Sequence, residues 1–234
     1  MNNEAQKKWF KQSYGLGEKR IETGYGWPLE VEPELKNLIE EIKKTLPTGK
    51  VLDLGCGQGR HTIYCAEKGF ESYGIDYIER AIEEAKQKAK EKNLKNAYFK
   101  TMDILQLDFP EDFFDVIIDC SVLDHIKYSD WNKYLENITK VLKMGRFLIL
   151  IEFSANDPRI NEKTRHLYEH KDRPFPHSLY FENEDHYDHY FNEKEIRELF
   201  SKNFKVISIK ETILSQHSNI PDHLMVNVLL KRIS

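Results

Sequence analysis

The stretch Lys50-Val51-Leu52-Asp53-Leu54-Gly55-Cys56-Gly57-Gln58-Gly59 decides the fold of this chain. Residues 50–54 form a short apolar run that predicts a buried strand, and residues 55–59 carry three glycines that predict a turn. A helical pattern follows from Arg60 to Lys68 and ends before Gly69. Glycine lets a backbone approach a ligand closely, and a helix N-terminus offers unpaired N–H groups. Together these features predict a ligand site in an α/β fold.

The same alternation continues along the chain. Further strands are predicted at residues 71–75, 97–101, 113–119 and 146–151, and helices at residues 35–46, 78–93 and from Ser129, its N-cap, onward. Strands that alternate with helices predict a parallel sheet joined by right-handed crossovers. Ligands of such sheets bind at the carboxyl ends of the strands, so the candidate residues are expected at that edge.

The alternation stops after Glu152. Residues 154–190, rich in His, Tyr, Phe, Asp and Pro, predict no regular element, and a loop of this length is typical of a functional lid. Asn192 and Glu195 then predict the start of a helix, and strands follow at 204–210 and 224–230. We therefore expect one domain over residues 1–234. Its predicted parts are an N-terminal arm and helix (1–48), a ligand-binding core (49–152), a lid or substrate insertion (153–191), and a C-terminal helix and hairpin (192–234).

Composition limits the possible partners. The chain has 234 residues, 40% hydrophobic and 32% charged, which is typical of a globular protein. Its formal net charge of −4 disfavours a nucleic-acid partner, which usually meets a basic face. An apolar run of membrane-spanning length and an export signal are absent, and the three cysteines form no disulfide-like pattern. We therefore expect a cytoplasmic protein without a membrane partner, while the sequence does not decide its oligomeric state.

The glycine spacing separates two kinds of cofactor. A dinucleotide-binding turn has the pattern Gly-x-Gly-x-x-Gly or Ala, but Arg60 occupies the last of those positions here, and Gly59 gives Gly-x-Gly-x-Gly. This spacing disfavours NAD. Asp76 ends the second predicted strand, where its carboxylate could accept hydrogen bonds from two ribose hydroxyls, and it could also cap the helix that starts near Ile78.

Four segments in order, residues 51–59, 73–76, 101–104 and 114–119, resemble the motifs of the class I S-adenosylmethionine (SAM) dependent methyltransferases. The resemblance covers about residues 50–152 and resumes more loosely over 190–231. It implies a three-layer Rossmann-like α/β sandwich with a mostly parallel seven-stranded sheet and an antiparallel last strand. It also implies that SAM is the cofactor and that the protein is of the small-molecule methyltransferase type.

The resemblance implies roles for particular residues. It places the carboxylate of Asp53 and the turn backbone near the methionine part of SAM, acidic side chains at the ribose and the adenine, and the end of the fourth strand at the methyl group. The implied cofactor-binding residues are Asp53, Gly55, Cys56, Gly57, Asp76, Tyr77, Asp103, Ile104, Asp119 and Cys120.

The chemistry of the acceptor is less constrained. Methyl transfer needs an acceptor atom held in line behind the methyl carbon, and a general base is needed only if that atom carries a proton. Asp124 and His125 are the candidates for such a base, with helix capping and loop hydrogen bonding as the alternative. Aromatic residues in the N-terminal arm and in residues 154–190 suggest a roofed pocket for a small molecule. Residues 119–122 lack the Asn/Asp-Pro-Pro-Tyr/Phe motif of base and glutamine methyltransferases.

Other interpretations stay open at this point. The chain could hold SAM as a regulatory module without transferring methyl, act as an NAD-dependent oxidoreductase, or methylate ribosomal RNA or protein. His166-Leu167-Tyr168-Glu169-His170 spells the pattern of inverted zinc peptidases, and His186 and His189 lie beside acidic residues. Short motifs of this kind arise often by chance, so no metal is expected.

Overall fold

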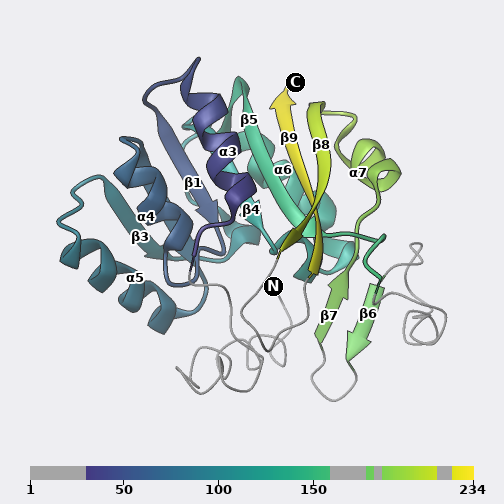
Figure 1. The fold of residues 1–234 in the computed structure, drawn as a ribbon, viewed down its shortest axis with the longest axis horizontal. Helices are drawn as coiled ribbons and strands as arrows, with labels where there is room; N and C mark the ends of the chain where they lie inside the picture. The colour runs from purple at the N-terminus through teal and green to yellow at the C-terminus, as the bar shows by residue number, and fades with distance from the viewer. Residues whose placement is uncertain (1–29, 159–177, 182–185, 215–222) are drawn as a thin grey trace.

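A seven-stranded sheet in the order β3-β2-β1-β4-β5-β9-β8 forms the centre of the computed structural model (Figure 1), which describes residues 30–158, 178–181, 186–214 and 223–234. Strands β1 to β5 pair in parallel, and β9 is antiparallel to both of its neighbours, β5 and β8. This is the predicted Rossmann-like arrangement with an antiparallel last strand. Its strands are β1 (Lys50–Leu54), β2 (Glu71–Asp76), β3 (Ala97–Thr101), β4 (Phe114–Cys120), β5 (Leu142–Phe153), β8 (Phe204–Leu214) and β9 (His223–Arg232).

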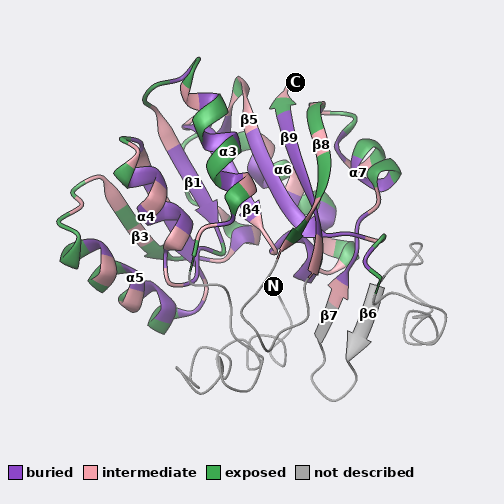
Figure 2. Ribbon diagram, in the orientation of Figure 1, coloured by how far each residue is buried: buried purple, intermediate pink, exposed green. Residues whose placement is uncertain are grey.

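Helices cover both faces of this sheet and produce two cores (Figures 1 and 2). On one face the apolar stripe of α3 packs against β1, β4 and β5, together with Cys65 of α4. On the other face α6 and α7 pack against the opposite side chains of the same strands. The helices are α3 (Pro33–Lys43), α4 (Arg60–Glu67), α5 (Glu79–Glu91), α6 (Trp131–Val141) and α7 (Glu193–Phe200). In the part of the chain that is described, none of them has the length and apolar character needed to span a bilayer.

Strand alternation decides which face each residue at the carboxyl edge serves. Successive side chains of a strand point to opposite faces. Asp53 and Cys120 therefore point to the α3 and α4 face, along with Val51 and Ile118 of that core. Asp119 points instead to the α6 face, where it meets Tyr134. The candidate residues thus separate into two groups at one edge of the sheet.

The structure confirms the predicted start of α7 and corrects the start of α6. The Asn192 side chain accepts a hydrogen bond from the backbone amide of Glu195, and the Glu195 carboxylate accepts one from the backbone amide of Asn192. Ser129 was expected to cap α6, but it lies inside the 3-10 turn η3 (Tyr128–Asp130), and the N-cap position belongs to Asp130. The reason is that this turn leads directly into the helix, and the first turn of α6 has no side-chain cap.

The structure also contains more β-strand than the sequence predicted. Strand β5 extends from Leu142 to Phe153 because its carboxyl half pairs with β9 as far as Phe153, opposite Met225. The segment predicted to be irregular contains a two-stranded antiparallel sheet of β6 (Ser178–Phe181) and β7 (His186–His189). Backbone pairing between these two strands creates regular structure that the charged and aromatic composition did not indicate.

The turn after β1 requires glycine for a reason that mutation can isolate. Gly59 has φ +81°, and a Cβ there would lie 2.7 Å from the Phe99 ring and 2.9 Å from the Ala85 Cβ, whereas Gly69 has φ +92° and nothing within 4 Å. We expect Gly69→Ala to destabilise by about 1–2 kcal/mol through its backbone alone. Gly59→Ala should cost about 1–3 kcal/mol more through overpacking. Urea unfolding of both variants checks this, and equal losses would contradict it.

Candidate active site

The glycine turn and Asp76 form one hydrogen-bonded unit. Gly55 and Gly57 have φ of +58° and +53°, the left-handed region that favours glycine. The Gly57 amide donates to Asp76 Oδ2 at 3.0 Å, and the Ile78 amide donates to Oδ1 at 2.8 Å. The carboxylate therefore joins the turn after β1 to the start of α5. Burial raises the pKa of Asp76 to about 6, against the opposing effect of the Ile78 and Gly57 amides.

Asp53 serves the neighbouring helix. Its Oδ2 accepts from the Thr62 amide at 3.1 Å and from the Thr62 hydroxyl at 2.7 Å, and the side chain is buried. Thr62 lies in the first turn of α4, where backbone N–H groups have no partner inside the helix. Asp53 thus caps α4 from the adjacent strand and fixes the glycine turn between them.

The candidates for the adenine lie after β3, beside Asp76. Strand β2 pairs with β3 so that Asp76 is opposite Thr101. Asp103 accepts from the Leu105 amide at 2.9 Å and so starts the 3-10 turn η1 (Ile104–Gln106). Burial raises the pKa of Tyr77, next to Asp76, far above its usual range. The structure therefore brings the residues implied for ribose and adenine to one corner of the sheet.

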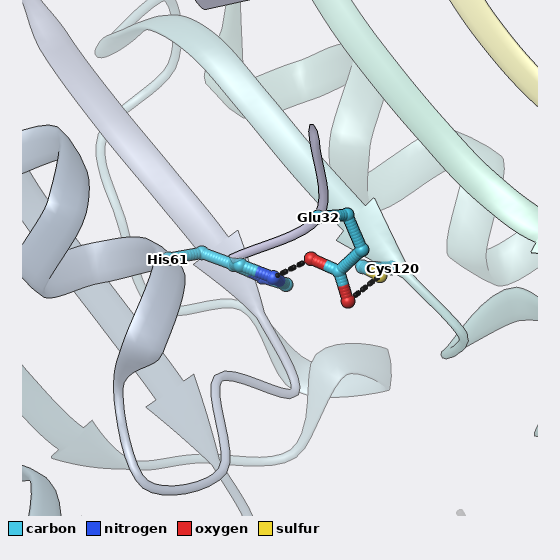
Figure 3. Close-up of side chains that lie close together, drawn as sticks. All are labelled: Glu32, His61 and Cys120. Atoms are coloured by element: carbon cyan, nitrogen blue, oxygen red, sulfur yellow. Dashed lines mark hydrogen bonds and ion pairs between the residues drawn. The ribbon is translucent and has the colours of Figure 1, made fainter. Parts of the chain in front are cut away.

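A buried cluster on the α3 and α4 face was not predicted as a site from the sequence. Glu32, just before α3, contacts His61 of α4, with Cys120 alongside (Figure 3). Arg60 of α4 also contacts Glu32. Arg60 Nη2 lies 2.5 Å from Glu32 Oε1, and His61 Nε2 lies 2.5 Å from Glu32 Oε2. Cys120 Sγ is 3.7 Å from Glu32 Oε1. An acidic residue before a proline-started helix was the only local signal for this cluster.

The donor set of this cluster resembles a metal site, but its cation is a guanidinium. The donor atoms of Glu32, His61 and Cys120 lie within 4.8 Å of one another, and Cys, His and carboxylate are ligands that zinc accepts. Arg60, however, already contacts this group: besides Glu32, its guanidinium lies 2.8 Å from His61 Nε2 and 3.9 Å from Cys120 Sγ. The cluster is therefore an ion-paired joint between the segment before α3 and the start of α4.

On the α6 face, Asp119 organises the turn after β4. Its Oδ1 accepts from the amides of Val122 and Leu123 at 3.1 and 3.3 Å, and its Oδ2 accepts from the Tyr134 hydroxyl at 2.6 Å. The side chain is fully buried. Asp119 therefore holds the backbone that follows Cys120, which is the segment the resemblance places beside the methyl group.

Two more carboxyl groups are buried behind this turn. Glu152 lies one residue before the end of β5, and Asp124 lies in the 3-10 turn η2 (Leu123–His125). Burial, followed by the carboxylates of Asp119 and Asp124, raises the pKa of Glu152 well above its usual range. Burial also raises the pKa of Asp124 to about 7, although His125 opposes this shift. Burial thus disfavours the charged form of both carboxyl groups.

His125 faces two of the acidic side chains. Its Nδ1 lies 2.9 Å from Asp188 Oδ1, on β7, and its Nε2 lies 3.7 Å from Asp124 Oδ1. The edge of its ring meets Phe153 at 6.4 Å between centroids. The two predicted base candidates are thus neighbours at the strand edge. The contribution of Asp188 was missed because no local pattern connects a residue on β7 to the turn after β4.

Only one part of the predicted histidine motifs, around His189, can be described in the structure. Residues 166–170 lie outside the described residues, as do the aromatic residues of the N-terminal arm. His189 packs against the rings of Trp131 and Phe191, at centroid distances of 5.1 and 4.4 Å, and its Nε2 is 3.8 Å from Glu195 Oε2. His189 therefore anchors the end of β7 in the aromatic core.

Comparison with known proteins agrees with this geometry. A family described as "Methyltransferase domain" matches residues 47–204, more than half of the chain. The chain belongs to this methyltransferase family. Residues 47–204 therefore form a methyltransferase domain.

Individual relatives differ in what they methylate. The 2-heptyl-1-hydroxyquinolin-4(1H)-one methyltransferase of Mycobacteroides abscessus is 30% identical over 62% of the chain and 63% of that protein. The tRNA N(3)-methylcytidine methyltransferase of Schizosaccharomyces pombe is 24% identical over 86% of the chain and 64% of that protein. The chain thus spans less than two thirds of either relative.

A solved structure shares the fold at lower identity. The 1,6-didemethyltoxoflavin-N1-methyltransferase of Burkholderia thailandensis, solved with its substrate and S-adenosylhomocysteine, has a TM-score of 0.71 at 19% identity. The match covers 98% of this chain and 88% of that one. The whole described architecture, including the segment after β5, therefore belongs to a fold that methyltransferases use.

The ion-paired joint predicts that the protein loses folding stability in acid. Burial alone would raise the pKa of Glu32, but His61 and Arg60 lower it to about 2 from 4.5. A carboxyl group with a lowered folded pKa stabilises fully above its unfolded pKa and loses that contribution as pH falls. We expect Glu32→Gln to lower the free energy of unfolding by about 1.5–3 kcal/mol at pH 7. This difference should shrink progressively below pH 4.5. Glu40→Gln, at an exposed pair with Lys68, is the control and should change little.

The buried carboxyl groups behind the turn after β4 predict the opposite change of stability with pH. Because the pKa of Glu152 is raised by burial and by its acidic neighbours, the wild-type protein loses stability as pH rises through the folded pKa. Glu152→Gln keeps the shape and removes the titration, so we expect equal or higher stability at pH 8. Asp119→Asn should instead destabilise, because three donors point at its carboxylate. Thermal unfolding at pH 6 and pH 8 checks both, and a large loss in Glu152→Gln would contradict the assignment.

Proposed function

We propose that this enzyme transfers the methyl group of SAM to a small-molecule acceptor by in-line displacement. One observation carries the proposal: the left-handed glycine turn is bonded through Gly57 to the buried carboxylate of Asp76, and Asp124 and His125 lie at the same strand edge. The glycine turn bonded to Asp76 can bind a nucleoside that carries a charged tail. Asp124 and His125 suit removal of a proton from an acceptor.

The residues at this edge fit the cofactor. Asp76 keeps acceptor capacity on both oxygens for the ribose hydroxyls, since each oxygen takes one amide in the structure. The backbone of Gly55, Cys56 and Gly57 would hold the methionine part, and Tyr77, Asp103 and Ile104 would border the adenine. In this proposal Asp53 and Asp119 contribute by fixing the backbone on either side, because their oxygens bond within the protein.

The methyl-transfer step requires little covalent chemistry from the protein. When bound, SAM supplies a methyl group on a cationic sulfur, which keeps the bonding electron pair as the acceptor's lone pair forms the new bond to carbon. His125 accepts the proton from an acceptor O–H, N–H or S–H and becomes an imidazolium. Positioning of the acceptor can contribute about 7–11 kcal/mol and the base about 10²–10⁴-fold in rate.

A small acceptor has more support than a polymer. The formal net charge of −4 disfavours the basic face that phosphate contacts need. The quinolone and toxoflavin methyltransferases, to which the chain is similar, are named for small-molecule acceptors. The tRNA relative favours a second candidate, transfer to RNA. Transfer to total tRNA that exceeds transfer to any small acceptor would replace the first proposal with the second.

Calorimetric titration tests the cofactor assignments. We expect SAM and its demethylated product to bind and NAD not to bind. Asp76→Ala should weaken SAM binding by about 1–3 kcal/mol, because charge-assisted hydrogen bonds to the ribose are lost. Asp108→Ala, which removes an exposed carboxylate beside Lys100, is the matched control and should bind like the wild type. Unchanged affinity in Asp76→Ala would overturn the ribose assignment, and tighter binding of NAD would overturn the cofactor.

A further inference from the structure

The hairpin inserted between β5 and α7 brings a carboxylate to His125. His125 Nδ1 lies 2.9 Å from Asp188 Oδ1, which is the distance of a close ion pair. Both side chains are largely removed from solvent, with 4% of His125 and 15% of Asp188 exposed. Little water therefore competes for this contact, and it constrains the ring more than a surface pair would.

The position of Asp188 is fixed by its neighbours along the chain. His189 packs edge-on against the stacked rings of Trp131 and Phe191. Phe191 in turn exchanges backbone hydrogen bonds with Phe153 and Ala155 at the end of β5. The chain after Asp188 is thus held by ring contacts at His189 and by backbone hydrogen bonds to the end of β5 at Phe191.

We propose that Asp188 is a positioning residue that holds the Nδ1–H of His125 and thereby makes Nε2 the nitrogen that accepts the acceptor's proton. The inference rests on the proposed function. A carboxylate on one ring nitrogen selects the tautomer, fixes the ring plane, and stabilises the imidazolium that forms when the other nitrogen gains a proton. The hairpin then completes the base instead of only covering the acceptor.

Below neutral pH, the other acidic groups around His125 are less suited than Asp188 to position its ring. Asp124, in the same turn, has a pKa of about 7 because burial disfavours its charge, so it is mostly neutral in mildly acidic solution. Burial and nearby carboxylates raise the pKa of Glu152 on β5 and so disfavour its charge, and Asp119 on β4 is engaged by Tyr134 and two amides. The carboxylate nearest to the ring is that of Asp188, at 2.9 Å, against 3.7 Å for Asp124.

Asp188→Asn tests the inference through the pH profile of methyl transfer. We expect kcat to fall by about 10- to 100-fold, less than the full contribution of a general base, with the SAM affinity unchanged. The acidic limb of the kcat profile should move to lower pH, because a lost carboxylate lowers the pKa of His125. Glu193→Gln, an exposed acid that pairs with Arg197 on α7, is the control and should change neither quantity.

A double variant separates positioning from a structural role. If Asp188 acts through His125, Asp188→Asn should cost almost nothing in a His125→Gln background. An equal loss in both backgrounds would show that Asp188 only supports the hairpin and would overturn the inference.

A measurement that does not depend on methyl transfer tests the His125–Asp188 pair directly. In protein with ¹⁵N-labelled histidine, NMR should show His125 protonated at Nδ1 when neutral, and this preference should be lost in Asp188→Asn. The same spectrum in both proteins would overturn the inference. If the wild type bound SAM but methylated no acceptor, the proposed function would fail while this spectrum still decided the His125–Asp188 pair.

Discussion

The alternation of side chains along parallel strands is the constraint on which this site depends. At the carboxyl edge, Asp53 and Cys120 face α3 and α4, whereas Asp119 faces α6. The first group fixes the glycine turn, and the second fixes the turn that carries His125. One sheet edge therefore supports two sets of polar groups that never compete for the same hydrogen-bond donors, and a register shift of one residue would exchange them.

The sequence allowed the cofactor side of the site to be predicted because its residues are local. The strand, the three glycines and the acidic end of β2 lie in short segments whose spacing reflects backbone requirements. The ordered motifs also gave the sheet topology correctly. The roles of Glu32 and Asp188 could not be predicted, because each reaches its partner through the tertiary fold. Glu32 meets Arg60 from 28 positions away, and Asp188 comes from a segment whose composition hid a hairpin.

The cluster of Glu32, His61 and Cys120 shows how side-chain types alone can mislead. By composition these residues are a zinc set, but Arg60 supplies the positive charge that the carboxylate needs. A buried carboxylate without a cation would be costly, and a guanidinium offers several donors in a fixed plane. The arrangement also joins the chain before α3 to the first turn of α4. The geometry of the glycine turn is therefore supported from outside the motif as well as from Asp53.

The antiparallel placement of β9 affects how the chain can be made. Strand β5 pairs with β9 over residues 147–153, and β8 reaches the sheet only through β9. During synthesis, the outer edge of β5 therefore stays unpaired until residues 223–232 have left the ribosome. This exposed edge carries apolar residues such as Leu148 and Leu150, and open strand edges of that kind invite association with other chains. Pairing with β9 therefore protects the nascent protein from aggregation through the edge of β5.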